Sequence, residues 1–123
     1  MRVSVVLSDA NVLGGGSKFA ADLASALKGI GHEVAVCAWD RPKPNRCHEE
    51  FLDINSERWF TPSFVYNLGA VYKTTFNLAS AVKRCVRGFD PDVVINTTTP
   101  TVLRVVPERV KRITYVYFPT ELT

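Results

Sequence analysis

The segment of residues 2–39 reads RVSVVLSDANVLGGGSKFAADLASALKGIGHEVAVCAW. It begins and ends with short apolar runs, residues 2–7 and 34–39, of the kind that form buried parallel strands. Between them, Ser17 is a good N-cap for a helix whose apolar side chains recur on one stripe, and glycines at 29 and 31 mark its end. The stretch between the runs is long enough for a right-handed crossover, so the segment predicts one Rossmann-like βαβ unit.

The same alternation continues toward the C-terminus. Apolar residues recur at threes and fours between Ser63 and Arg87, which predicts a long amphipathic helix. Strands are expected at Asp92–Asn96 and Arg112–Phe118, with a short helix over about residues 97–106 between them.

Residues 40–62 give less regular signals. Prolines interrupt this stretch, where we expect a short strand at His48–Ile54 and a loop at Ser56–Pro62. The alternation of strands and helices along the whole chain defines the class as α/β. We expect a single Rossmann-like, three-layer α/β/α domain over residues 1–123, with a mostly parallel sheet.

The composition narrows the kind of protein. Apolar residues make up 46% of the chain, enough for one core, and a net charge of only +3 argues against a nucleic-acid binder. Cys37, Cys47 and Cys85 have no metal-ligand spacing, and their odd number predicts free thiols and a cytoplasmic location. No apolar stretch approaches the ~20 residues that span a bilayer, so any membrane contact is expected to be peripheral.

In open parallel sheets, ligands gather at the carboxyl ends of the strands. Here those ends are expected at residues 8–16, 39–41, 96–100 and 118–120. The first contains Gly14, Gly15 and Gly16, whose backbone N–H groups are not covered by side chains and lie where a helix begins. A phosphate or sugar can therefore approach the positive helix end closely, although a flexible tight turn would also explain the glycines.

Two known phosphate-binding loops do not match this run. A P-loop requires Gly-Lys-Ser/Thr, but here Lys18 follows a serine and precedes Phe19. A dinucleotide fingerprint needs its third glycine where Phe19 stands, which argues against an NAD site even though Asp40 lies near the distance of a ribose carboxylate.

Polar residues follow two of the predicted strands. Asp9 and Asn11 can bond acceptor hydroxyls, or can stabilise a turn through bonds to the backbone. Thr97, Thr98 and Thr99 occupy the equivalent position after a later strand, where their hydroxyls can meet a sugar or cap the next helix. We select Asp9, Asn11 and Thr98 as candidate acceptor-binding residues.

Three segments of the chain resemble one known family. Residues 14–34, GGGSKFAADLASALKGIGHEV, and residues 90–94, DPDVV, look like the glycine loop, helix, turn and Pro-Asp-Val-Val strand of retaining GT4-type glycosyltransferases. Residues 115–120, YVYFPT, are similar to the Tyr-Val-His-Tyr-Pro-Thr segment of mannosyltransferases that extend lipid-linked oligosaccharides.

The resemblance implies the N-terminal, acceptor-side half of a GT-B fold, whose C-terminal donor-binding domain is absent from these residues. Such an enzyme transfers a hexose from a nucleotide-sugar to a glycan or lipid-linked acceptor, without a metal or other cofactor. It further implies that Gly14, Gly15 and Gly16 lie near the donor diphosphate or the transferred sugar, and that the chain alone is inactive.

Tyr117 departs from the family pattern. It stands where those mannosyltransferases have a histidine proposed to contact the donor sugar. A tyrosine can donate a hydrogen bond, but it titrates near ~10 and is a poor base at neutral pH. Tyr117 is therefore a candidate catalytic residue whose role differs from that of the family histidine.

A rival reading from another class is a stand-alone Rossmann-like module that binds a nucleotide or a protein without catalysis. For the enzyme, a further expected partner is the cytosolic face of a membrane, although an ordinary solvated surface would also explain the basic residues involved. These are Lys73, Lys83, Arg84, Arg87, Arg104, Arg109, Lys111 and Arg112. A missing partner domain should leave an apolar face near Phe118–Leu122 that favours self-association.

Overall fold

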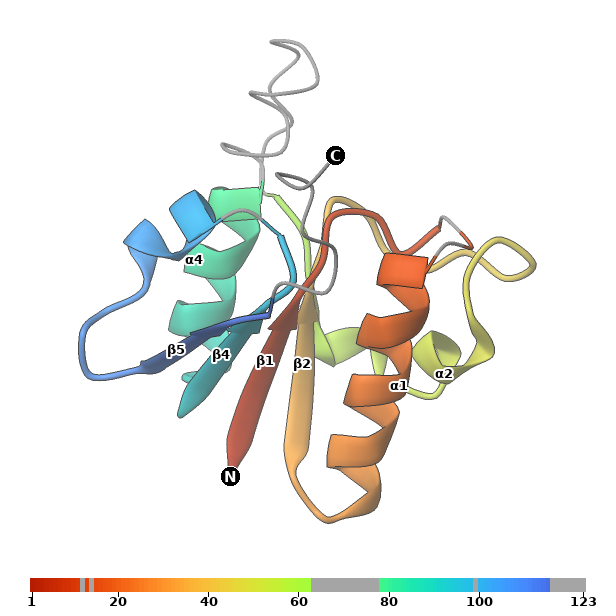
Figure 1. Cartoon of the computed structure of the whole chain (residues 1–123), viewed down its shortest axis with the longest axis horizontal. Coiled ribbons are helices and arrows are strands. Elements are labelled where there is room, and N and C mark those ends of the chain that lie inside the picture. Colours follow the sequence, from red (N-terminus) through yellow and green to blue (C-terminus); the bar gives the residue numbers. More distant parts are fainter. Residues whose placement is uncertain (12, 14, 63–77, 99, 116–123) are drawn as a thin grey trace, which may run out of the picture.

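A computed structural model describes residues 1–11, 13, 15–62, 78–98 and 100–115 of the chain. These residues form one sheet in the spatial order β3-β2-β1-β4-β5 (Figure 1). All four pairings between neighbouring strands are parallel, which confirms the α/β class. The strands are β1 (Arg2–Val6), β2 (Glu33–Cys37), β3 (Trp59–Phe60), β4 (Val93–Asn96) and β5 (Lys111–Thr114).

Helices cover both faces of the sheet. Helix α1 (Gly15–Gly29) and the short α2 (Glu49–Leu52) pack on one face, while α4 (Leu78–Gly88) and the 3-10 helix η3 (Pro100–Val105) pack on the other (Figure 1). A further 3-10 turn, η1 (Ser56–Arg58), leads directly into β3. The described residues therefore form the three layers of a Rossmann-like domain, as predicted.

The core on the α1 side joins both of its helices to the central strands. Ala20 and Ala24 of α1, with Phe51 of α2, are fully buried against Val5 and Val36 of the sheet. Small residues on α1 allow the helix to approach the strands closely, and the larger Phe51 fills the space beside them.

The core on the opposite side is built around α4. Leu78, Val82 and Cys85 are buried at spacings of three and four, and they pack in one cluster with Val6 and Cys37. This spacing confirms the predicted amphipathic helix for its last part. The remainder of that prediction, residues 63–77, lies outside the described residues.

The C-terminus of α1 explains the Gly-His segment that follows it. Gly31 has φ +101°, a conformation that L side chains rarely adopt. Its N–H donates to the Lys28 carbonyl (3.1 Å), and the His32 N–H donates to the Leu27 carbonyl (3.1 Å). These two bonds are those of a Schellman motif, so the segment stops the helix and turns the chain into β2.

Three local expectations were wrong. Helix α1 already begins at Gly15, so Ser17 lies inside its first turn and is not the N-cap. The stretch His48–Ile54 contains α2 instead of a strand: Phe51 and Ile54 are buried three residues apart while Leu52 between them is 45% exposed, as in a helix. Residues 56–62 are not a plain loop, because they hold η1 and β3.

The remaining elements are close to their expected places. Strand β5 begins at Lys111, one residue before the predicted start, and residues 116–118 of that prediction lie outside the described residues. The short helix after β4 is of the 3-10 type. In the described part of the chain, no helix has both the length and the apolar character needed to cross a membrane.

Candidate functional site

The carboxyl ends of β1 and β4 lie next to each other. The two strands pair in register, with Val6 opposite Asn96. In the sheet, β1 lies between β2 and β4. The chain adds β2 and β3 on one side of β1 and then β4 and β5 on the other, so the strand order reverses at this point. Open α/β sheets bind their ligands in the crevice at such a reversal, which is where the predicted segments after β1 and β4 now meet.

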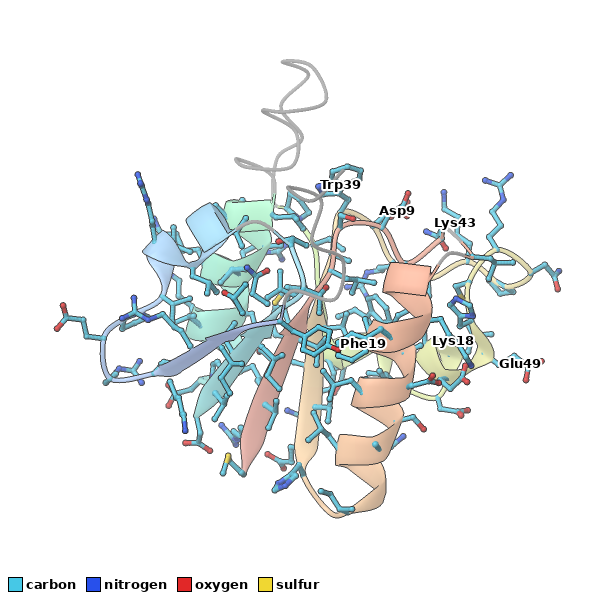
Figure 2. The ribbon with its side chains drawn as sticks, viewed as in Figure 1. Asp9, Lys18, Phe19, Trp39, Lys43 and Glu49 are labelled. Carbon is cyan, nitrogen blue, oxygen red and sulfur yellow. The ribbon has the colours of Figure 1, made fainter. Side chains whose placement is uncertain are left out.

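The end of β2 joins the same edge. The Trp39 N–H donates to the Ser8 carbonyl oxygen at 3.0 Å. Figure 2 shows Trp39 and Asp9 at this edge of the molecule, above the strands. Three of the four predicted strand ends are therefore brought together, and the fourth, residues 118–120, lies outside the described residues.

Asn96 holds the segment after β4 in place. Its side chain is fully buried, and its Oδ1 accepts from the Thr98 N–H (3.0 Å) and from the Thr98 hydroxyl (2.7 Å). Its Nδ2 donates to the Thr98 carbonyl at 3.3 Å. Thr97 is tied to β1, because its N–H and its hydroxyl both donate to the Val6 carbonyl (3.0 and 2.7 Å).

Thr98 is thus placed at the strand-end edge by three contacts with one amide. Thr97 has a structural role, but it bonds to β1 instead of capping the next helix, and Thr99 lies outside the described residues. Sequence reasoning missed the part played by Asn96. The available signal was a polar residue closing an otherwise apolar strand, since a buried amide must find hydrogen-bond partners.

Asp9 and Asn11 form a turn after β1. The Asp9 Oδ1 accepts from the Asn11 N–H at 2.9 Å. The Asn11 side chain donates to the Arg41 carbonyl (3.0 Å) and accepts from the Lys43 N–H (2.7 Å). Asn11 therefore connects the loops that follow β1 and β2, whereas Asp9 is half-buried at the edge itself.

Gly15 and Gly16 are the first two residues of α1. The first N–H groups of a helix have no partner within it, and the helix dipole makes this end positive. The first turn of α1 contains no acidic residue that would neutralise this potential. The glycines therefore lie at a helix end suited to an anion, beside the crevice at β1; Gly14 lies outside the described residues.

The basic side chain of Lys18, in the first turn of α1, is engaged by two carboxylates. Its Nζ contacts the Glu50 carboxylate at 2.9 Å and the Asp22 carboxylate at 3.1 Å. Hydrogen bonds to Glu50 and then Asp22 raise the pKa of Lys18, and the same bond to Lys18 lowers the pKa of Glu50. The ammonium group thus links α1 to α2, as its position in Figure 2 also indicates.

One cavity of the described residues lies mostly away from this edge. It has a volume of about 780 Å³ and lies beside α2 and β3, where it is lined by Lys28, His32, Phe51, Ile54, Arg58 and Trp59 among others. Its lining includes no residue from 8–16 or 96–98. The lining also contains polar side chains, among them Arg41 and Asp53. We place the candidate site at the strand ends because the strand order reverses there, which is where open α/β sheets bind their ligands.

Within the described residues, no three His, Cys, Asp or Glu side chains gather in a way that would hold a metal ion. The three cysteines are free and buried, as predicted. Ser4 Oγ lies 2.7 Å from Cys85 Sγ. A hydrogen bond with Cys85 and burial raise the pKa of the Cys37 thiol well above its usual value, so this thiol stays protonated and is a poor nucleophile.

The fold is that of a Rossmann-like domain, and the candidate site lies at the reversal of its strand order. A family model described as Glycosyltransferase Family 4 matches residues 13–119, nearly the whole chain. The chain therefore belongs to glycosyltransferase family 4, and the resemblance of its glycine loop, helix and turn to that family is confirmed. No curated protein matches the chain.

Proposed function

We propose that this chain is the acceptor-side domain of a retaining glycosyltransferase, which transfers a hexose from a nucleotide-sugar to a glycan or lipid-linked acceptor. The observation that carries the proposal is the family match over residues 13–119, which includes the glycine run at the start of α1. In this proposal a C-terminal domain binds most of the donor, and the chain is inactive without it.

The position of the candidate residues after the strands and at the start of α1 supports the roles that we propose for them. Gly14, Gly15 and Gly16 face the donor diphosphate, where the positive end of α1 stabilises the charge that develops as the bond to the sugar breaks. Asp9 and Thr98 contact the acceptor hydroxyls. Catalysis then depends on positioning and fixed dipoles, with no metal or other cofactor.

Asn11 and Tyr117 have other roles in this proposal. Both ends of the Asn11 amide already bond to residues 41 and 43, so Asn11 supports the acceptor site mainly by holding its loop. Tyr117, outside the described residues, is proposed to hydrogen-bond the donor sugar, because its phenol is a donor at neutral pH but not a base.

Calorimetric titration with GDP-mannose and UDP-glucose tests the division into two domains. We expect binding to the complete enzyme that contains this domain, and none to the 123-residue chain, because the donor contacts reside mainly in the other half. Turnover of one of these donors by the complete enzyme should accompany binding. Tight nucleotide binding by the 123-residue chain would instead identify a self-sufficient binding module.

The distribution of charge supports a peripheral membrane contact. Between residues 78 and 115 the chain carries seven basic and three acidic side chains, a net charge of +4, whereas residues 1–62 carry seven basic and eight acidic side chains, a net charge of −1. The basic residues in the first range are exposed and belong to α4, η3, β5 and the loop between them. The positive charge is therefore concentrated on one half of the domain.

Removing two of these charges should weaken binding to anionic vesicles. Each basic residue near an anionic surface contributes about 1 kcal/mol, so Lys83→Ala with Arg87→Ala should lower vesicle partitioning roughly 20- to 30-fold at low salt. The matched control is Lys43→Ala with Arg46→Ala, which removes the same charge from the near-neutral half. Co-sedimentation with phosphatidylserine vesicles measures the effect. An equal loss of binding in both double variants would contradict a membrane contact through the basic half of the domain.

A further inference from the structure

The two tryptophans of the chain differ in their surroundings. Trp59, in β3, is 3% exposed and belongs to the core on the α1 side. Trp39 follows the end of β2 and is only half-buried: it packs against the edge of the core around α4, and Figure 2 shows it above the strands. Part of an indole ring is therefore exposed at the edge that holds the candidate site.

Trp39 lies beside the segment that follows β1. Backbone hydrogen bonds extend the pairing of β1 with β2 past both strand ends. The Leu7 N–H donates to the Cys37 carbonyl, and the Trp39 N–H donates to the Ser8 carbonyl, both at 3.0 Å. Ser8 is thus the neighbour of Trp39 across this edge, and Asp9 is the next residue of the chain. The indole and the Asp9 carboxylate therefore start from neighbouring backbone positions, and Figure 2 shows both above the strands.

One oxygen of the Asp9 carboxylate is available to a ligand. Oδ1 accepts from the Asn11 N–H at 2.9 Å, whereas Oδ2 has no hydrogen-bond partner within the described residues. The carboxylate of Asp40 differs, because its Oδ1 accepts from the Arg41 N–H (2.8 Å) and its Oδ2 contacts Lys43 Nζ (3.3 Å). A half-buried carboxylate oxygen such as Asp9 Oδ2 is suited to accept a hydroxyl group from a ligand.

The charges around Trp39 disfavour a phosphate group at this place. Asp9 is its neighbour across the edge, and Asp40 follows it in the chain. The adjacent guanidinium group of Arg41 donates to the Ser56 carbonyl at 2.8 Å and is engaged there. Because like charges brought together weaken binding, a neutral group is favoured beside Trp39.

We propose that Trp39 is the surface on which the terminal sugar ring of the acceptor packs; this inference rests on the proposed glycosyltransferase. A pyranose ring has a face of C–H groups and a rim of hydroxyls, so it needs an apolar surface together with a hydrogen-bond acceptor. Trp39 supplies the apolar surface, and Asp9 Oδ2 accepts a hydroxyl. The acceptor is accordingly a glycan that ends in a pyranose, and a bare lipid phosphate is not the group that receives the hexose.

Tryptophan fluorescence of the 123-residue chain tests the contact directly. We expect methyl β-glucopyranoside or methyl α-mannopyranoside to shift the emission to shorter wavelength in a saturable way, because the sugar ring displaces water from the indole. The Trp39→Phe variant keeps only the buried Trp59 and should show no saturable shift. Glycerol, which has hydroxyls but no ring, should shift neither protein. The inference is overturned if neither glycoside gives a saturable shift, or if Trp39→Phe shows the same shift.

Steady-state sugar transfer by the complete enzyme gives a second readout. With GDP-mannose or UDP-glucose as donor and the same methyl glycosides as acceptors, Trp39→Ala should raise the acceptor KM about tenfold. It should leave kcat nearly unchanged, because the ring contact is the same in the ground state and the transition state. Trp39→Phe should restore most of the lost affinity, since it keeps an aromatic surface.

Phe60→Ala is the matched control. Phe60 is also partly buried against the core around α4, but its ring lies beside Gly88, where an added Cβ would be 3.1 Å from Phe60 Cε1. Gly88 ends α4 shortly before β4 begins, so this ring points toward the opposite end of the sheet. Phe60→Ala should leave the acceptor KM unchanged. An equal rise of KM in Phe60→Ala and Trp39→Ala overturns the inference, because disturbed packing then explains both.

The two experiments separate this inference from the proposed function. An enzyme that transfers sugar with an acceptor KM insensitive to Trp39→Ala contradicts only the role of Trp39. A saturable fluorescence shift that requires Trp39, in a protein whose complete form turns over no nucleotide-sugar, contradicts only the function.

Discussion

Gly15→Val is expected to lower the rate of sugar transfer by the complete enzyme at least about 100-fold, the loss seen when one preorganised donor to a developing anion is removed. Gly15 is the first residue of α1, the helix that follows β1 in the chain. A branched side chain there covers the N–H groups that face the donor diphosphate in our proposal. Steady-state kinetics with the preferred nucleotide-sugar measures the effect.

The other end of the same helix supplies the control. A side chain added at Gly29 meets no atom within 4 Å, so Gly29→Val changes α1 equally in composition but far from the strand ends. Gly29→Val should retain near-normal transfer, and both variants should show the far-ultraviolet circular dichroism of the parent. A fully active Gly15→Val enzyme would show that the glycine loop takes no part in the reaction.

Phe51→Ala is expected to produce the largest loss of stability, about 3–5 kcal/mol in the free energy of unfolding. Phe51 is fully buried in the core between α1, α2 and the sheet, and its ring meets that of Trp59 edge to face at 5.4 Å. Truncation removes this contact and leaves a cavity that a four-residue helix cannot refill by shifting. Urea denaturation with linear extrapolation gives the difference.

Leu52→Ala is the matched control, because Leu52 is the next residue of the same helix and is 45% exposed. It should change the free energy of unfolding by less than about 1 kcal/mol. Similar losses in the two variants would mean that α2 does not pack on α1 as described.

Most of the fold could be predicted because its main elements have clear patterns. The apolar run of β1 and the three-and-four spacing of buried residues in α4 identify their conformations directly. Two of the three errors fall between Cys37 and Leu78, where α2 has four residues and β3 has two. Elements this short do not repeat the hydrophobic period of a helix or strand, and their conformation depends on tertiary contacts such as that of Phe51 with Trp59.

The candidate site could be predicted as a region but not as a set of contacts. Parallel strands place their carboxyl ends at one edge, so the segments containing Asp9 and Thr98 were expected to meet there. The attachment of Asn11 to residues 41 and 43 depends on how two loops pack, and no local pattern encodes it. The roles proposed for Gly14, Gly15, Gly16 and Tyr117 remain predictions for the experiments above.

The hydrogen bonds from the Asn96 side chain to residue 98 hold the loop after β4 mainly through its backbone. Two of the three contacts involve the backbone of residue 98, its N–H and its carbonyl, and only one involves the hydroxyl. The loop therefore keeps most of its support whichever side chain stands at that position. A different side chain at position 98 can therefore be presented at the same place on the sheet edge without changing the backbone that holds it.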